Sequence, residues 1–407
     1  MTIFYVDPAA GSGGTGTEAN PFNNFSSITT VAGDSVLIRT NTTFNGGIPD
    51  AIFAPGNVTV GYYGTGARPI IFGGQTVTMT ASASPGIFQW SAGSNICGNA
   101  SINNVMCRWV EWNTSLAITA PTMTDDSMTF DYVNFILYVK PAGGTLAGKT
   151  VVASVVVNGA RDDDGGTLNF IDGIDFRRMS RHGAVMANAH GVHYRDCIAR
   201  ECGGWRDIAG NFWVGNGFEI GGTSIDAVIE RCESYSVFDS GFTSQLYAAQ
   251  TGVQAARNHT YVDCKVVGCG YSGYEFAALD TFQRLEGMYV IRPYARDCGV
   301  DAHWSQNRGN KGHAISMIAG HTGLGALDRV LVESPDFARQ KYGVRNSFSN
   351  GVMRINGGTI TGSETNAILT EQLGSPSYAR TIVAISSRTN ITGTDANGGY
   401  SDSIVRF

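Results

Sequence analysis

Residues 261–276 read YVDCKVVGCGYSGYEF, with two cysteines five residues apart and a glycine nine residues after the first. The pattern recurs in the second half of the chain, where VHYRDCIARECGG (192–204) again spaces two cysteines by five and Cys232 precedes Gly241 by nine. Looser copies are anchored at Gly173, Pro293, Ser334, Gly357 and Ser386, so successive anchors lie 24, 35, 32, 29, 41, 23 and 29 residues apart. A recurrence of this length is typical of a solenoid built from stacked coils.

Each copy holds short alternating runs rich in Val, Ile and Tyr, separated by Gly, Asn, Asp or Ser. Such runs predict short strands, and coils of two or three strands indicate an all-β parallel β-helix. Equivalent residues of successive coils then stack about 4.8 Å apart. We therefore expect one interior ladder of Cys197, Cys232 and Cys264, and a second of Cys202, Cys269 and Cys298.

Three explanations of the cysteines compete. A zinc site would bring paired ligands together, but the chain contains no CxxC motif. Stacked thiols could reach disulfide distance, which leaves oxidation open, and Cys97 and Cys107 could pair with each other. We favour reduced thiols that pack as small buried hydrophobic groups.

The composition narrows the possible classes of protein. The chain has 407 residues, of which 43% are hydrophobic and 15% charged, with a net charge of −6. It can bury a large core, and its charge argues against a general nucleic-acid binder. No apolar run approaches membrane-spanning length, so we expect no membrane partner. Met1 leads directly into TIFYVDPAAG, and no signal peptide is visible. If the protein is extracellular, it is exported without a cleaved signal, its signal has already been removed, or it is part of a virion.

The N-terminal stretch YVDPAAGSGGTGTEANPFNNFSSI (5–28), followed by AGDSVLIRTNTTF (32–44), resembles the opening of right-handed parallel β-helix proteins of the pectate-lyase-like superfamily. The Gly33-Asp34 pair before a hydrophobic strand is also typical of that group. FDYVNFILYVKPAGG (130–144) resembles a small β insertion found in some members. The resemblance implies an N-terminal cap and first coils in 1–85, an antiparallel β insertion in 86–165, and regular coils in 166–407. The superfamily contains lyases, hydrolases, epimerases and phage tailspikes, so the resemblance implies a fold more strongly than an activity.

A candidate site follows from the strand after each repeated glycine. Strand alternation points the first residue after the glycine inward and the next outward. If GAVM (183–186) and AHWS (302–305) fill the same place in their coils, the outward residues form one column: Val185, Glu219, Thr243, Glu275, Trp304 and Arg345. Carboxylates, an indole and a guanidinium in one line suit a sugar-binding groove. A register shift of one residue would instead point both glutamates inward.

Long segments between strands predict walls beside this column, in 203–216, 246–258 and 305–328. The third segment carries Arg308, Lys311 and His313, and Asp239 and Asp301 lie in turns that enter the same sheet. We expect substrate contacts from a further set of residues: Trp304, Arg345, Trp213, Thr243, Gln245, Tyr274 and His303.

Two reactions on a polysaccharide suit these residues, and the resemblance favours the first. β-Elimination from an acidic, uronic-acid-containing polymer needs a carboxylate neutraliser and a base for the C5 proton, for which Arg308, Lys311, His313 and Arg345 are candidates. Calcium could assist, held by Asp301, Glu275 or Glu219. Glycoside hydrolysis would instead use Glu219 and Glu275, with Asp239 and Asp301 as alternates, at a separation near the about 6.5–9.5 Å of inverting enzymes.

A third possibility is a tailspike or adhesin that binds glycan without cutting it. Tailspike depolymerases of this superfamily usually act as trimers, so both a monomer and a homotrimer stay open.

Overall fold

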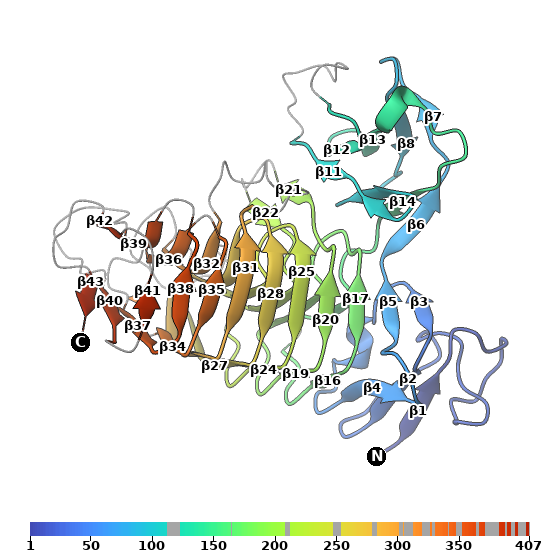
Figure 1. The fold of residues 1–407 in the computed structure, drawn as a ribbon. Helices are drawn as coiled ribbons and strands as arrows, with labels where there is room; N and C mark the ends of the chain where they lie inside the picture. The colour runs from blue at the N-terminus through green and yellow to red at the C-terminus, as the bar shows by residue number, and fades with distance from the viewer. Residues whose placement is uncertain are drawn as a thin grey trace.

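The computed structural model describes most of the chain, namely residues 1–111, 123–163, 165–207, 212–246, 254–278, 283–300, 304, 312–319, 326–327, 330–340, 342–346, 352–363, 366–370, 382–386, 389–391, 395–397 and 404–406. These residues form a parallel β-helix with three faces, and its two chain ends lie at opposite ends of the solenoid (Figure 1). The predicted all-β fold is confirmed, and the described residues contain only short 3-10 turns such as η1 (Asp50–Ile52) and η3 (Ala142–Gly144).

Each face is a parallel sheet whose neighbouring strands come from successive coils. The first face contains β1 (Ile3–Val6), β2 (Ser35–Arg39), β4 (Thr59–Tyr63), β16 (Phe170–Asp172), β19 (His193–Arg195), β24 (Val228–Glu230), β27 (Gln254–Val262), β30 (Gln283–Ile291), β34 (Val330–Glu333), β37 (Val352–Asn356), β40 (Ile382–Ile385) and β43 (Ile404–Arg406), with β33 (Ala326–Leu327) beside β30. The second face contains β3 (Thr43–Asn45), β5 (Ile70–Phe72), β17 (Asp175–Arg177), β20 (Ile198–Arg200), β25 (Glu233–Val237), β28 (Lys265–Cys269), β31 (Tyr294–Cys298), β35 (Asp336–Ala338), β38 (Thr359–Thr361) and β41 (Asn390–Ile391). The third face contains β15 (Ala160–Asp162), β18 (Ala184–Ala187), β23 (Phe218–Gly221), β26 (Phe242–Leu246), β29 (Ser272–Ala278), β32 (His313–Ala319), β36 (Tyr342–Asn346), β39 (Asn366–Thr370) and β42 (Asp395–Asn397).

The N-terminal coil explains the motif that resembles other β-helix proteins. Asp34 accepts hydrogen bonds from the backbone N–H groups of Thr2, at 2.6 Å, and Val31, at 3.0 Å. These bonds hold the pKa of the Asp34 carboxyl below its usual value. The carboxylate therefore fastens the start of β1 to the turn that precedes β2. On the other edge of β1, the backbone N–H of Phe22 donates to the oxygen of Tyr5 at 2.9 Å, and that of Asp7 donates to the oxygen of Phe22 at 2.8 Å, so this segment covers the first strand.

The corner between the first and second faces is turned by a single residue in the left-handed region. Gly173, Asp196, Arg231, Asp263 and Arg292 occupy equivalent positions there, with φ between 49° and 67°. One such residue redirects the chain between two strands without a loop. The residue that follows enters the interior, which is where the cysteines stand.

The first cysteine ladder is as predicted: Cys197, Cys232 and Cys264 precede strands whose first residues pair in register. The second ladder needs a correction, because Val237 lies between Cys202 and Cys269, and Cys298 follows. Valine fills the same interior position because the site selects a small hydrophobic side chain rather than a thiol.

All eight cysteines, including Cys97 and Cys107, are buried, and none of them forms a disulfide. Burial raises the pKa of Cys202 and Cys264 to about 12. Their thiols therefore stay protonated and contribute as packing groups.

Aromatic rings continue this stacking inside the third face. The rings of Phe218 and Phe242 stack with centroids 5.4 Å apart, and those of Phe242 and Tyr274 with centroids 5.3 Å apart. Tyr274 is fully buried, and its hydroxyl donates to the backbone oxygen of Cys264 at 2.6 Å. The expectation that Tyr274 contacts substrate is therefore wrong, because this residue belongs to the interior column.

The repeated glycines leave no room for a side chain at the corner between the second and third faces. A Cβ atom at Gly217 would lie 2.5 Å from the backbone oxygen of Gly241 and 2.3 Å from the Ser234 hydroxyl. We expect Gly217→Ala to lower the free energy of unfolding by about 1–3 kcal/mol, measured by urea denaturation. Gly11→Ala is the matched control, since nothing lies within 4 Å of its Cβ position. Equal stability of the two variants would contradict the close stacking described here.

A buried histidine gives the interior a predicted pH dependence. His259 Nε2 lies 3.0 Å from the backbone oxygen of Ser224 and must donate, so Nδ1 accepts from the Ser244 hydroxyl at 2.8 Å. Burial lowers the pKa of His259 from 6.5 to about 4. Above pH 6.5 the neutral ring stabilises the fold, and this contribution, about 3 kcal/mol, is lost as the pH falls towards 4.

Urea unfolding of the wild type and of His259→Gln, each at pH 7.5 and pH 4.5, measures this contribution. We expect the wild type to lose about 3 kcal/mol more than the variant on acidification. The same loss in both proteins would show that His259 is not the titrating group.

An antiparallel unit interrupts the coils between the second and third faces, and we call it the insertion. One sheet contains β6 (Gly74–Val77), β14 (Val151–Ser154), β9 (Ala100–Ile102) and β10 (Val105–Met106). The other contains β7 (Thr80–Ala81), β8 (Phe88–Ser91), β13 (Ile136–Lys140), β12 (Ser127–Asp131) and β11 (Arg108–Trp109). The strands of the insertion therefore run from 74 to 154, whereas the sequence suggested 86–165. β15 already belongs to the third face, because it pairs in parallel with β18.

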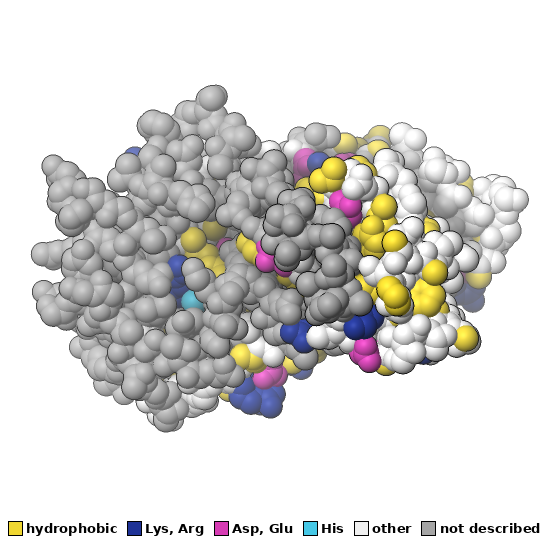
Figure 2. Space-filling model, turned by 90° about the horizontal axis from the view of Figure 1, so that it is seen from above, with side chains coloured by type: hydrophobic (Ala, Val, Ile, Leu, Met, Phe, Trp, Pro, Cys, Tyr) yellow, Lys and Arg dark blue, Asp and Glu magenta, His cyan; other side chains and the backbone are white. Residues whose placement is uncertain are grey.

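Seen from above, several hydrophobic side chains reach the surface of the insertion (Figure 2).

Candidate functional site

The outward column of the third face is the centre of the candidate site. In register, it contains Val185, Glu219, Thr243, Glu275, Ser316 and Arg345. The residues on either side of each, such as Phe218 and Ile220, point into the core. The register therefore directs both glutamates and the arginine to the outside of the β-helix. Gln245, also predicted to contact substrate, points outward two residues beyond Thr243 and is half-buried.

Trp304 is not part of this column, and this prediction is wrong. Ser316 pairs with Glu275 and Arg345, so HAIS (313–316) fills the place that was assigned to AHWS. The Trp304 ring instead packs on Phe238, with centroids 5.2 Å apart, and its indole N–H donates to the backbone oxygen of Ser236 at 2.9 Å. Trp304 thus closes a corner of the fold rather than offering a surface to a sugar ring.

Trp213 has a similar role in the same cluster. Its ring centroid lies 5.8 Å from that of Phe238 and 5.9 Å from that of Trp109, which comes from the insertion. Trp109 also donates its indole N–H to the backbone oxygen of Gly204 at 3.0 Å. Trp213 lies in the hairpin of β21 (Trp205–Asp207) and β22 (Phe212–Val214). The cluster therefore joins the insertion and this hairpin to the corner between the second and third faces.

The column does not form an open groove. Glu219, Glu275 and Arg345 are only 1%, 4% and 7% exposed, and Thr243 is fully buried. The sequence predicted a sugar-binding groove along this column, but its polar side chains are buried. A buried charged side chain destabilises the folded protein unless it is paired or hydrogen-bonded. The contacts of these side chains therefore indicate what the site can do.

Glu219 is held by two side chains from the corner that precedes it. Asn216 Nδ2 donates to Glu219 Oε2 at 2.7 Å, and His182 Nδ1 lies 3.1 Å from the same oxygen. The backbone N–H of Asn216 also donates to His182 Nδ1, at 3.2 Å. Burial lowers the pKa of His182 to about 4, although the charge of Glu219 opposes this shift. His182 is therefore neutral near pH 7, and because its Nδ1 accepts from the backbone N–H of Asn216, it positions Glu219 through Asn216 rather than by donating to the carboxylate.

Glu275 lies two coils along the column, so its Cα atom is about 10 Å from that of Glu219. Its Oε2 atom accepts a hydrogen bond from the Ser240 hydroxyl at 2.6 Å. Asp239, the residue before Ser240, is also buried in the turn that enters β26. Three carboxyl groups are thus gathered on neighbouring coils of one face.

A cationic and aromatic group lies at the other end of the column. The Arg345 guanidinium donates from Nη1 to the Tyr271 hydroxyl at 2.8 Å. The Tyr271 ring meets the His313 ring edge-on, with centroids 5.5 Å apart. Arg345 and Tyr271 are two coils apart, so the arginine side chain extends back along the column towards the coil of Glu275. The third face therefore carries the phenol of Tyr271, the imidazole of His313 and the guanidinium of Arg345 on the same side as the carboxylate of Glu275.

Sequence reasoning missed four of these residues: His182, Asn216, Ser240 and Tyr271. The signal was present, because each stands one or two residues before a repeated glycine, in the corner that leads into the third face. His313 stands in the same row, one residue before Ala314. The row of residues before the glycines, and not only the column after them, carries polar groups.

Four predicted residues lie outside the described part of the chain: Arg308, Lys311, Asp301 and His303. The possible calcium ligand Asp301 is among them. Within the described ranges, no group of three or more His, Cys, Asp or Glu side chains could hold a metal ion. Nor does any described helix have the length and apolar character needed to cross a membrane.

Comparison with known proteins supports the fold. No protein-family model matches the sequence, and no curated protein is detectably similar to it. Among solved structures, a glycoside hydrolase aligns with all of this chain and 96% of its own, at 8% identity and a TM-score of 0.58. A rhamnogalacturonan lyase aligns with all of this chain and 87% of its own, at 10% identity and a TM-score of 0.54. A tailspike protein of Pseudomonas phage LKA1 aligns with 90% of this chain and 73% of its own, at 11% identity and a TM-score of 0.31.

These likenesses extend over nearly the whole chain at very low identity. The two likenesses with TM-scores above 0.5 agree with the parallel β-helix fold of this chain, and at this identity they show the fold alone. Function has to be argued from the side chains of the third face.

Proposed function

We propose that the protein cleaves an acidic polysaccharide by β-elimination at the outer side of the third face. The observation that carries this proposal is the contact between Arg345 and Tyr271, beside His313 and on the same face as Glu275. Elimination needs a cation, a base and an acid close together, and these residues supply one of each. The named activities of the two structural neighbours, a glycoside hydrolase and a rhamnogalacturonan lyase, agree with a polysaccharide substrate.

In the proposed reaction, Arg345 binds the carboxylate of a uronic acid residue through charge-assisted hydrogen bonds. The positive charge makes the neighbouring C5 proton easier to remove. To act as the base, Tyr271 has to be a phenolate; its oxygen then takes that proton, and the electron pair of the C5–H bond forms the C4–C5 double bond. The C4–O bond breaks, and Glu275 gives a proton to the departing oxygen.

Glycoside hydrolysis is the second candidate, and the spacing of Glu219 and Glu275 favours it. Their Cα atoms are two coils apart, about 10 Å, which is compatible with the carboxyl separation of inverting enzymes. Glu275 would protonate the departing oxygen, and Glu219 would activate a water molecule with His182 and Asn216 holding it in place. Asp239 is an alternate for either role.

Either reaction requires access to side chains that are buried in this structure. A polysaccharide can react only where these side chains become accessible to it. We propose that the protein acts outside a cell, secreted or on a virion, where such polymers occur, as a monomer or a homotrimer.

A digest of acidic and neutral polysaccharides tests the proposal, with ultraviolet absorbance and reducing ends measured together and with or without chelator. Elimination produces an unsaturated uronyl end, so both signals should rise. Reducing ends without absorbance would replace elimination by hydrolysis. Glycan binding with neither signal would overturn both reactions and favour a non-catalytic tailspike or adhesin.

A further inference from the structure

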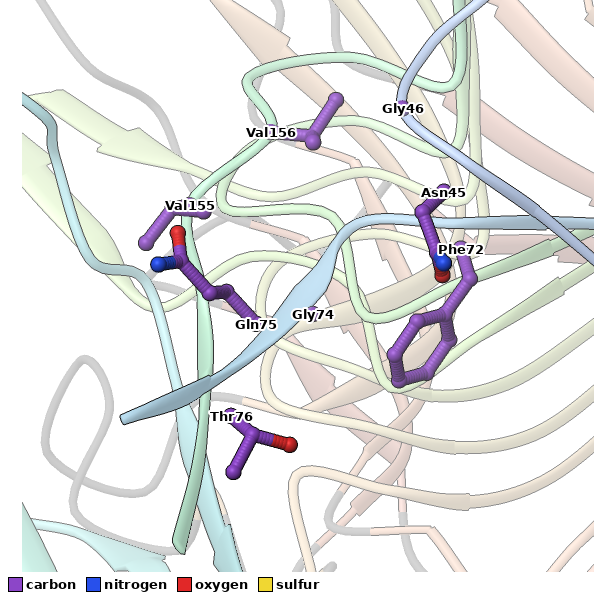
Figure 3. Close-up of a pocket in the computed structure, with 8 residues that line it drawn as sticks. All are labelled: Asn45, Gly46, Phe72, Gly74, Gln75, Thr76, Val155 and Val156. Atoms are coloured by element: carbon purple, nitrogen blue, oxygen red, sulfur yellow. The ribbon is translucent and has the colours of Figure 1, made fainter. Parts of the chain in front are cut away.

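A pocket of about 410 Å³ lies where the insertion leaves the β-helix, away from the candidate site (Figure 3). The first coil contributes one side of it, and the two strands that carry the insertion contribute the other. In Figure 3, Asn45 and Phe72 lie on one side of Gly74, and Gln75 and Val155 on the other. None of the residues that line the pocket carries a charge. They are Asn45, Gly46, Phe72, Gly74, Gln75, Thr76, Val155 and Val156.

The polar groups of this pocket have hydrogen-bonding capacity to spare. Within the described ranges, the side chains of Asn45, Gln75 and Thr76 form no hydrogen bond to another residue. The half-buried ring of Phe72 is steadied by the guanidinium of Arg178, 5.9 Å from the ring centroid. A rigid aromatic ring is therefore placed among free amide and hydroxyl groups. The volume falls within the range of small-molecule sites, which often form where two structural units meet.

The chemistry of the lining selects the ligand. No charged side chain lines the pocket, so an ionic ligand would find no opposite charge there. The two amides and the hydroxyl can donate to and accept from hydroxyl groups, while Phe72 and the two valines offer apolar surface. A pyranose combines a ring of hydroxyl groups with an apolar face of C–H bonds. We propose that this pocket binds one uncharged sugar residue.

The pocket and the candidate site lie along the same corner of the β-helix. Ile48, two residues after Gly46, forms a parallel bridge with Ala160 at the start of the third face. From Ile48 the coils continue through Ala160, Ala184, Phe218 and Phe242 to Tyr274, beside Glu275. Five coil steps correspond to about 24 Å. We therefore infer that the bound sugar belongs to the same polymer, several residues from the bond that is cleaved, and this part rests on the proposed function.

Binding of methyl glycosides of glucose, galactose, mannose, rhamnose and N-acetylglucosamine, measured by ligand-observed NMR and calorimetry, tests the pocket directly. We expect at least one of them to bind with a dissociation constant on the order of 1–10 mM. Asn45→Ala combined with Gln75→Ala should weaken this binding about tenfold or more, since two hydrogen bonds are lost. Gln89→Ala, which removes an amide from the insertion outside the pocket, should bind like the wild type.

Three results would overturn the inference: no binding of any glycoside, equal binding by the pocket variant, or loss of binding in Glu275→Gln. The last result would place the sugar on the third face instead. A protein that binds a glycoside through Asn45 and Gln75 but degrades no polysaccharide would retain the pocket and refute only the proposed function. If both stand, the pocket variant should raise KM several-fold for long chains and leave disaccharide substrates unaffected.

Discussion

Replacing Glu275 by glutamine is expected to lower the turnover of polysaccharide by at least about a thousandfold, because a general acid is removed from the reaction. The Ser240 hydroxyl, 2.6 Å from Glu275 Oε2, can still donate to the oxygen of the glutamine amide. The variant should therefore fold normally and bind glycan with unchanged affinity. Both elimination and hydrolysis give Glu275 the role of proton donor, so the expected loss does not depend on which reaction occurs.

Glu233→Gln is the matched control for this variant. Glu233 lies on β25 of the second face, where the same chemical change leaves the third face untouched. Initial rates of reducing-end release should be unchanged in Glu233→Gln. Full activity of Glu275→Gln with an intact fold would remove Glu275 from the site.

Replacing Tyr271 by phenylalanine separates the two reactions. The change removes the hydroxyl that accepts from Arg345 and leaves the ring that contacts His313. Under elimination, the loss of the base should lower kcat by about 10²–10⁴-fold. Under hydrolysis, the two carboxyl groups remain and the change should be only a few-fold.

Tyr235→Phe on the second face is the control for Tyr271→Phe, and the pH dependence of kcat provides an independent readout. Tyr271→Phe should change the pH profile of kcat together with its size, whereas Tyr235→Phe should change neither. Retention of both the rate and the pH profile would assign the base to another residue.

Much of the fold was predictable because stacking leaves a local signal. Only small hydrophobic residues fit beside the left-handed corner, so Cys197, Cys232 and Cys264 recur there. Strand alternation then fixes which side faces outward, so Glu219 and Glu275 fall in one column. The register error at Trp304 arose where this signal is interrupted. Two residues separate Cys269 from Ser272, but fourteen separate Cys298 from His313.

The boundaries of the insertion and the burial of the site were not predictable in the same way. β6 (GQTV) is as short as a coil strand, and its antiparallel pairing with β14 distinguishes it from one. Burial of the column depends on contacts between distant parts of the chain. Trp109, Trp213 and Phe238 come from three separate segments and pack together at the corner beside Glu219. Such contacts follow from the folded arrangement and leave no periodic pattern in the sequence.

A crystal structure of Glu275→Gln with an oligosaccharide that the wild type degrades would test the central claim most directly. We expect the sugar rings to lie along the outer side of the third face, with the scissile oxygen beside residue 275 and a substrate carboxylate at Arg345. An oligosaccharide bound on the first or second face, with residue 275 still buried and remote from it, would contradict the account.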